Sequence, residues 1–100
     1  MSAEQSRIWF IRAPEQHHWR RWDDEFVLYD ELSGQTHLLN FIAADAMRLL
    51  QETPRSDADL ATALAELYRT ELTSEFCSRI RTLLSHFQQL GLTEDRLEGR

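Results

Sequence analysis

Short apolar segments separated by polar links occupy the first forty residues, and longer apolar stripes with a helical period follow them. The stretch 22–40, WDDEFVLYDELSGQTHLLN, holds two such segments, 25–29 and 35–39, around a link that contains Gly34. Short runs with β-branched and aromatic members around a glycine-containing link are typical of a β-hairpin. An earlier run at 7–12, RIWFIR, predicts another strand, which is apolar on both faces.

Two polar stretches are predicted to lie outside regular structure. Residues 13–21 are expected to form a link, because Pro14 lacks the N–H that a central strand needs. Trp19 and Trp22 are expected to cover the open end of a small core. Residues 93–100 are expected to form a frayed tail. The sequence leaves open whether strand 7–12 pairs within the chain or with a neighbouring chain.

Three helices are predicted from apolar positions that recur with a period near 3.6 residues, over 41–52, 57–69 and 74–90. Each prediction begins after a residue whose side chain can accept a hydrogen bond from the first helical turn, namely Asn40, Ser56 and Thr73. Gly91 stands where a left-handed glycine commonly ends a helix. Strands followed by a run of helices predict an α+β fold, with helices packed on one face of an antiparallel sheet.

The predicted architecture is winged-helix-like: an N-terminal three-stranded antiparallel β-sheet followed by a three-helix bundle. One hundred residues fit a single domain. Its core is expected at about 19–93, with an N-terminal strand and linker at 1–18 and a flexible tail at 94–100.

The charge balance argues against nucleic acid as a partner. The formal net charge is −6, and all 11 basic residues are arginines. Proteins that neutralise phosphates generally carry a basic face. Because no apolar run approaches the roughly 20 residues of a membrane span, no membrane association is expected. The single cysteine, Cys77, excludes an internal disulfide and favours a cytoplasmic location.

No catalytic, cofactor or metal site is expected, so the chain is interpreted as a non-enzyme. Cys77 and His86 are nine residues apart on one predicted helix and therefore face opposite sides. His17, His18 and His37 match no zinc-ligand spacing. The sequence has no glycine-rich phosphate loop.

The hairpin, Asn40 and the three helices together resemble the PqqD family. These are small peptide chaperones named for pyrroloquinoline-quinone synthesis, and their fold is also called the precursor-peptide recognition element. The resemblance covers about 19–93 and is closest to the PqqD-like proteins of HPr-kinase-related (HPr-rel-A) systems. Arg79 stands where the family often has an acidic residue. The matching residues are Trp22, Asp23, Val27, Leu28, Tyr29, Gly34, Leu38, Leu39, Asn40, Ala43, Ala44, Ile80, Leu83, Leu84, Gly91 and Leu92.

The resemblance implies a chaperone or adaptor that binds a ribosomally made precursor (leader) peptide and presents it to a modifying enzyme. By resemblance, that enzyme is a radical-SAM or HPr-kinase-related protein. Strand 35–39 would be an edge strand, with which an extended peptide can pair. The candidate peptide-binding residues are Thr36, His37, Leu38, Leu39, Arg79, Ile80, Leu83, His86 and Phe87.

Two questions remain open from the sequence. One edge of the third helix carries Arg79, Leu83, His86 and Leu90, the other carries Cys77, Arg81, Leu84 and Gln88, and either could face the peptide. A winged-helix DNA-binding regulator is the alternative function, although Arg79 and Arg81 are about 200° apart on the helix and form no single basic face. A homodimer through an exposed Trp9 and Ile11 is a secondary expectation.

Overall fold

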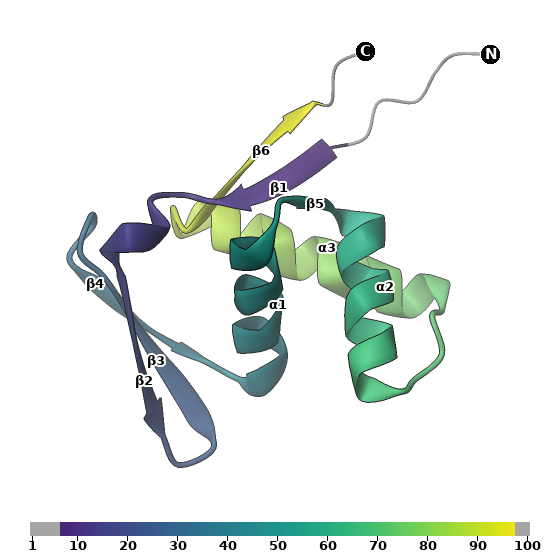
Figure 1. Cartoon of the computed structure of the whole chain (residues 1–100), viewed down its shortest axis with the longest axis horizontal. Coiled ribbons are helices and arrows are strands. Elements are labelled where there is room, and N and C mark those ends of the chain that lie inside the picture. Colours follow the sequence, from purple (N-terminus) through teal and green to yellow (C-terminus); the bar gives the residue numbers. More distant parts are fainter. Residues whose placement is uncertain (1–6, 98–100) are drawn as a thin grey trace.

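The computed structural model describes residues 7–97, apart from the side chain of Trp22, and this part has an α+β fold. It contains three α-helices, one short 3₁₀ helix and two antiparallel sheets of three strands each, in the orders β5-β1-β6 and β2-β3-β4 (Figure 1). The predicted fold class is confirmed. The predicted membership of the sheets is wrong, because strand 7–11 does not join the hairpin.

The β2-β3-β4 sheet contains the predicted hairpin. β3 (Glu25–Asp30) and β4 (Gln35–Leu39) pair in the register Leu28↔His37. The side chain of Asp30 closes the loop, since it accepts hydrogen bonds from the Leu32 N–H and the Ser33 Oγ, both at 3.1 Å. Gly34 has φ = 77°, a left-handed conformation that favours glycine.

β2 (His17–Trp22) is the third strand of this sheet and corrects the expected link at 13–21. Pro14 lies in a short 3₁₀ helix, η1 (Pro14–Gln16), which ends before β2 begins. The missing N–H of Pro14 therefore does not interrupt the strand. The sequence HHWRRW lacks apolar alternation because β2 is an edge strand whose only strand partner within 7–97 is β3.

The second sheet joins the two ends of the described chain. β1 (Arg7–Ile11) lies between β5 (Arg55–Ser56) and β6 (Thr93–Leu97), and Figure 1 shows β1 and β6 side by side along the helices. The expected tail is therefore a strand as far as residue 97, while 98–100 lie outside the described residues. The pairing of 7–11 is intramolecular.

The core takes in Trp9 and Ile11, which are only 5% and 7% exposed. The homodimer expected through these two side chains is wrong in its premise, because β1 has strand partners on both edges and packs onto the helices. Their apolar pattern on β1 reflects burial inside the chain.

The helices are α1 (Phe41–Glu52), α2 (Asp57–Tyr68) and α3 (Ser74–Gln89), and they confirm the predicted spans to within one residue. In each, the side-chain oxygen of the capping residue accepts a hydrogen bond from the amide three residues later, at 2.9–3.0 Å. The caps are Asn40, Ser56 and Thr73. Gly91, with φ = 80°, ends α3 as predicted.

One hydrophobic core unites both sheets with all three helices. Its members include Trp9 from β1, Leu28 from β3, Met47 from α1, Leu64 from α2 and Phe87 from α3. None of the helices in the described part is long and apolar enough to cross a membrane.

Candidate functional site

β4 has a free edge. Within residues 7–97 it pairs only with β3, so its other side presents backbone N–H and C=O groups without a strand partner. Such an edge is a template for pairing with an extended chain. The geometry on which the predicted peptide site depends is therefore present.

A groove of 410 Å³ lies between this edge and α3. Its β4 wall, its α3 wall and the start of α1 come from segments far apart in the sequence. The lining residues are Thr36, His37, Leu38, Leu39, Asn40, Ala43, Leu83, His86, Phe87 and Leu90.

Arg79 and Ile80, the two remaining candidates, line an adjoining hollow of 190 Å³. The two hollows share Asn40 and Leu83, so they form one surface that continues from β4 toward the beginning of α3. All nine predicted residues thus lie along one surface.

Burial separates the accessible residues of this surface from its floor. Ile80 and Phe87 are 2% and 0% exposed and belong to the hydrophobic core, while Leu39 is also buried. Leu83 is half-buried, whereas Arg79 and His86 are exposed. A peptide bound here would contact the side chains of Leu83, Arg79 and His86 and the backbone of β4. The buried residues would support this surface from below.

The two edges of α3 face different neighbours, which answers the question that the sequence left open. The edge with Arg79, Leu83 and His86 opens on the groove. On the other edge the Arg81 Nε donates to Asp57 Oδ2 of α2 at 2.9 Å. Arg81 is therefore held toward α2.

The electrostatics of the groove differ from those of the whole chain. Among residues 7–97, Arg79 has no carboxylate within ion-pair distance, although Glu75 lines the neighbouring hollow over α3 with it. His37 Nε2 is buried in the groove wall without a hydrogen-bond partner in this part of the chain. An acidic protein thus presents cationic and donor-capable groups at this surface.

A second histidine, His17 on β2, lies on the same sheet face. His17 Nε2 is 3.9 Å from Asp30 Oδ1, and both side chains are 2% exposed. Burial lowers the pKa of His17, an effect that the nearby carboxylate of Asp30 partly opposes.

Across the described residues, no group of three or more His, Cys, Asp and Glu side chains is arranged to hold a metal ion.

Three groove residues were not among the predicted peptide-binding set: Asn40, Ala43 and Leu90. From the sequence, Asn40 is predicted as a helix cap and matches the PqqD pattern, and Ala43 matches that pattern, but neither is in the predicted peptide-binding set. Leu90 follows Leu83 by seven residues, and the sequence already places it on the same helix edge; that edge opens on the groove, which brings Leu90 into the lining.

The family model of coenzyme PQQ synthesis protein D (PqqD) matches residues 25–92, from the start of β3 to just beyond α3. The chain belongs to the PqqD family. The match spans the hairpin, the three helices and both walls of the groove, so the family's shared part contains the whole candidate site.

The fold of this PqqD-family protein also occurs in a solved structure. It is similar to "TbiB1 in Complex with the TbiA(beta) Leader Peptide", with a TM-score of 0.66 and 21% sequence identity over 91% of this chain and 96% of that chain. At this identity the likeness establishes the fold. Comparison with curated proteins finds no match.

Proposed function

We propose that this PqqD-family protein is a non-catalytic adaptor, which binds a precursor (leader) peptide by β-strand addition and presents it to a modifying enzyme. The observation that carries the proposal is the free edge of β4 facing a groove whose far wall is α3. Family membership and the leader peptide bound to the structural neighbour support it.

In the proposed complex the peptide becomes a fourth strand beside β4. Backbone hydrogen bonds give affinity that depends little on sequence, and side chains give specificity. Successive side chains of an extended peptide point to opposite faces. One set would enter the groove toward Leu83 and His86, and the other would lie beside the exposed Leu38.

The groove favours a peptide with an apolar residue near Leu83 and an acidic residue near Arg79. Arg79 is exposed and has no carboxylate partner within 7–97, so its guanidinium is available to a guest carboxylate. Ion pairs with arginine add geometric specificity as well as energy.

An adaptor must also release its cargo. We expect a dissociation constant of about 1 μM, equivalent to about −8 kcal/mol, because tighter binding would slow the transfer to the enzyme. By family resemblance the receiving enzyme is a radical-SAM or HPr-kinase-related protein. The complex would form in the cytoplasm, where Cys77 stays a free thiol.

The DNA-binding alternative is less well supported. A recognition helix would need a basic face. Arg79 and Arg81 of α3 face the groove and α2 respectively, and the chain carries a net charge of −6.

The test is amide-shift mapping of the isotope-labelled protein with synthetic copies of short precursor peptides encoded beside its gene. We expect saturable shifts at 35–39, Leu83 and His86. The variant Arg79→Glu should bind an acidic peptide about fivefold more weakly, the size of a partly exposed ion pair.

Arg81→Glu is the matched control, since it makes the same charge change on the opposite edge of α3. It should leave peptide affinity unchanged. Shifts confined to 7–16 or 93–97 would contradict the proposed site. Equal losses in the two arginine variants would contradict the role of Arg79.

A further inference from the structure

The sheet that carries β4 has a second free edge on its far side. β2 is the other outer strand of the order β2-β3-β4, and within 7–97 it pairs only with β3 (Figure 1). Charged residues on an edge strand can serve simply to prevent self-pairing. Two further features, hollows on both faces and unpaired arginines, distinguish this edge.

The first hollow lies on the inner face, between β2, β3 and α1, and has a volume of 380 Å³. Its lining is mostly apolar, with Trp19, Phe26 and Ala44 among its residues. The carboxylate of Asp45 in its wall is already satisfied by the Arg48 guanidinium at 2.9 Å and the Tyr68 hydroxyl at 2.6 Å. This hollow therefore suits an apolar side chain.

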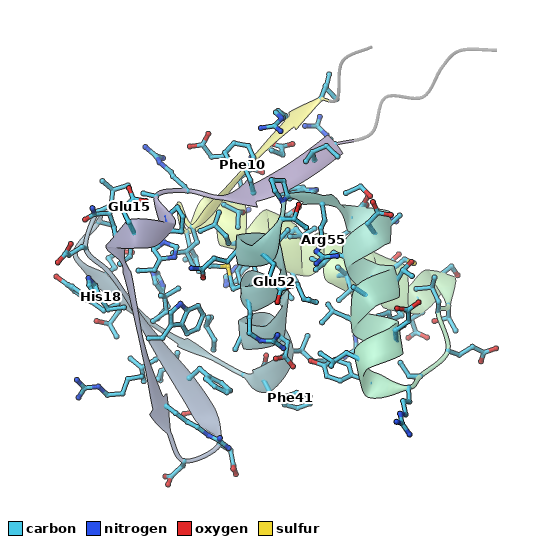
Figure 2. The ribbon with its side chains drawn as sticks, in the orientation of Figure 1. Phe10, Glu15, His18, Phe41, Glu52 and Arg55 are labelled. Carbon is cyan, nitrogen blue, oxygen red and sulfur yellow. The ribbon has the colours of Figure 1, made fainter. Side chains whose placement is uncertain are left out.

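The second hollow lies on the outer face of the same sheet and has a volume of 510 Å³. Figure 2 shows His18 on the side of β2 that faces away from α1. Trp19 contributes to both hollows, which therefore meet at this position of β2. The residues that line the outer hollow are His18, Trp19, Arg20, Val27, Tyr29 and Thr36.

This arrangement matches the geometry of an added strand. Because successive side chains of a strand alternate between the two faces, a strand beside β2 would direct alternate side chains toward the inner and the outer hollow. If the edge had a hollow on one face only, only the side chains of the added strand that point to that face would be accommodated.

The charged side chains at this edge indicate what kind of peptide segment it would bind. Neither Arg20 nor Arg21 has a carboxylate within 4.0 Å in the described residues. The same holds for Arg69, Arg79 and Arg96, whereas the other five described arginines each have at least one. Arg20 borders the outer hollow, and the Arg21 guanidinium lies 5.7 Å from the centre of the Phe26 ring. Arg20 thus places a cation without a carboxylate partner on the outer face, and Arg21 adds positive charge to the same edge from the inner face. Together they favour a bound strand with acidic side chains on its outer face.

We propose that the free edge of β2 is a second strand-docking site, which takes an extended segment of a partner protein whose apolar and acidic residues alternate. The inference rests on the proposed function in one respect: the partner is then the enzyme to which the peptide is presented. Since β2 and β4 are opposite edges of one sheet, both segments can be bound at the same time.

The probe is a short synthetic peptide in which valine and glutamate alternate, compared with a peptide of the same composition in which the two residues form separate blocks. Binding is measured by amide shifts on the Arg79→Glu protein, in which the β4 groove has lost its unpaired cation. We expect saturable shifts at 17–22, Phe26 and Ala44 with the alternating peptide, and weaker binding of the block peptide.

Charge reversal at both β2 arginines, R20E/R21E, should weaken this binding about tenfold. R69E/R96E is the matched control, because it makes the same charge change at two exposed arginines, one beyond the end of α2 and one on β6, that also have no carboxylate partner within 7–97. This control should leave the affinity for the alternating peptide unchanged. Both variants alter surface side chains, and their thermal unfolding verifies that they fold.

Shifts confined to β4 and α3, equal binding of the two peptides, or equal effects of R20E/R21E and R69E/R96E would overturn the inference. Self-association through 17–22 without peptide would overturn it in favour of a second copy of the chain. Precursor binding at β4 is measured separately, with the precursor peptides and the wild-type protein. Failure of the second site and failure of the proposed function are thus distinguishable.

Discussion

His17 shows how a single side chain can set the pH dependence of this protein. Its imidazole is 2% exposed, and its Nε2 has no hydrogen-bond partner among the described residues. Burial lowers its pKa below the unfolded value of about 6.5. The folded state therefore binds fewer protons than the unfolded state once the pH falls below that value.

We predict that the free energy of unfolding is greatest above about pH 6.5 and decreases as the pH falls toward the folded pKa, by at most about 1.4 kcal/mol per pH unit from this group. Urea unfolding at a series of pH values measures it. His17→Phe keeps a ring but cannot titrate, so it should flatten the profile. His86→Gln, at an exposed histidine, is the control and should not. Parallel profiles for wild type and His17→Phe would contradict the prediction.

Residues whose role is local were the ones that the sequence identified best. Asn40 caps α1 through its own side chain and an amide three positions away, an interaction that a short sequence window contains in full. By contrast, the orientation of Arg81 depends on Asp57, 24 residues earlier, on another helix. The sequence alone therefore does not determine which edge of α3 faces the groove, because that depends on how the helices pack.

At the scale of elements, the same distinction separates the strands that were predicted from those that were missed. The β3–β4 hairpin pairs neighbours in sequence and has a turn glycine, so its pattern is self-contained. β6 has the polar sequence TEDRL and pairs with β1 in the register Arg7↔Leu97, from the other end of the chain. No periodicity within five polar residues predicts such a partner.

β6 supports a prediction about truncation. Removing 93–100 deprives β1 of its partner along the full length from Arg7 to Ile11 and uncovers the edge beside Trp9. We expect a loss of about 3 kcal/mol or more in the free energy of unfolding, or about 15 °C in the melting temperature. Calorimetry measures it.

Removal of 98–100 alone is the control, since it leaves β6 whole, and we expect a melting temperature near that of the full chain. The frayed-tail interpretation makes the opposite prediction, that both truncations are harmless. A melting temperature unchanged after loss of 93–100 would mean that β6 contributes little to the fold.

At the scale of the whole molecule, the two sheets share one core. Trp9 and Ile11 from β1, Leu28 from β3 and Phe87 from α3 belong to the same buried cluster. Neither sheet encloses a hydrophobic core of its own, and a three-stranded sheet needs such packing for stability. The family match to 25–92 therefore omits β1, which is structurally part of the domain.

This shared core predicts that the protein unfolds as a single cooperative unit. Opening the β5-β1-β6 sheet alone would expose Trp9 and Ile11 and the helix surface beneath them, so it should cost nearly as much free energy as global unfolding. Native-state hydrogen exchange measures this directly. The slowest amides of β1 and of β3 should exchange with the same free energy and the same denaturant dependence, as in a two-state protein. Markedly faster exchange in β1 would show instead that the terminal sheet opens independently, leaving the hairpin, the groove and the helices as the stable part.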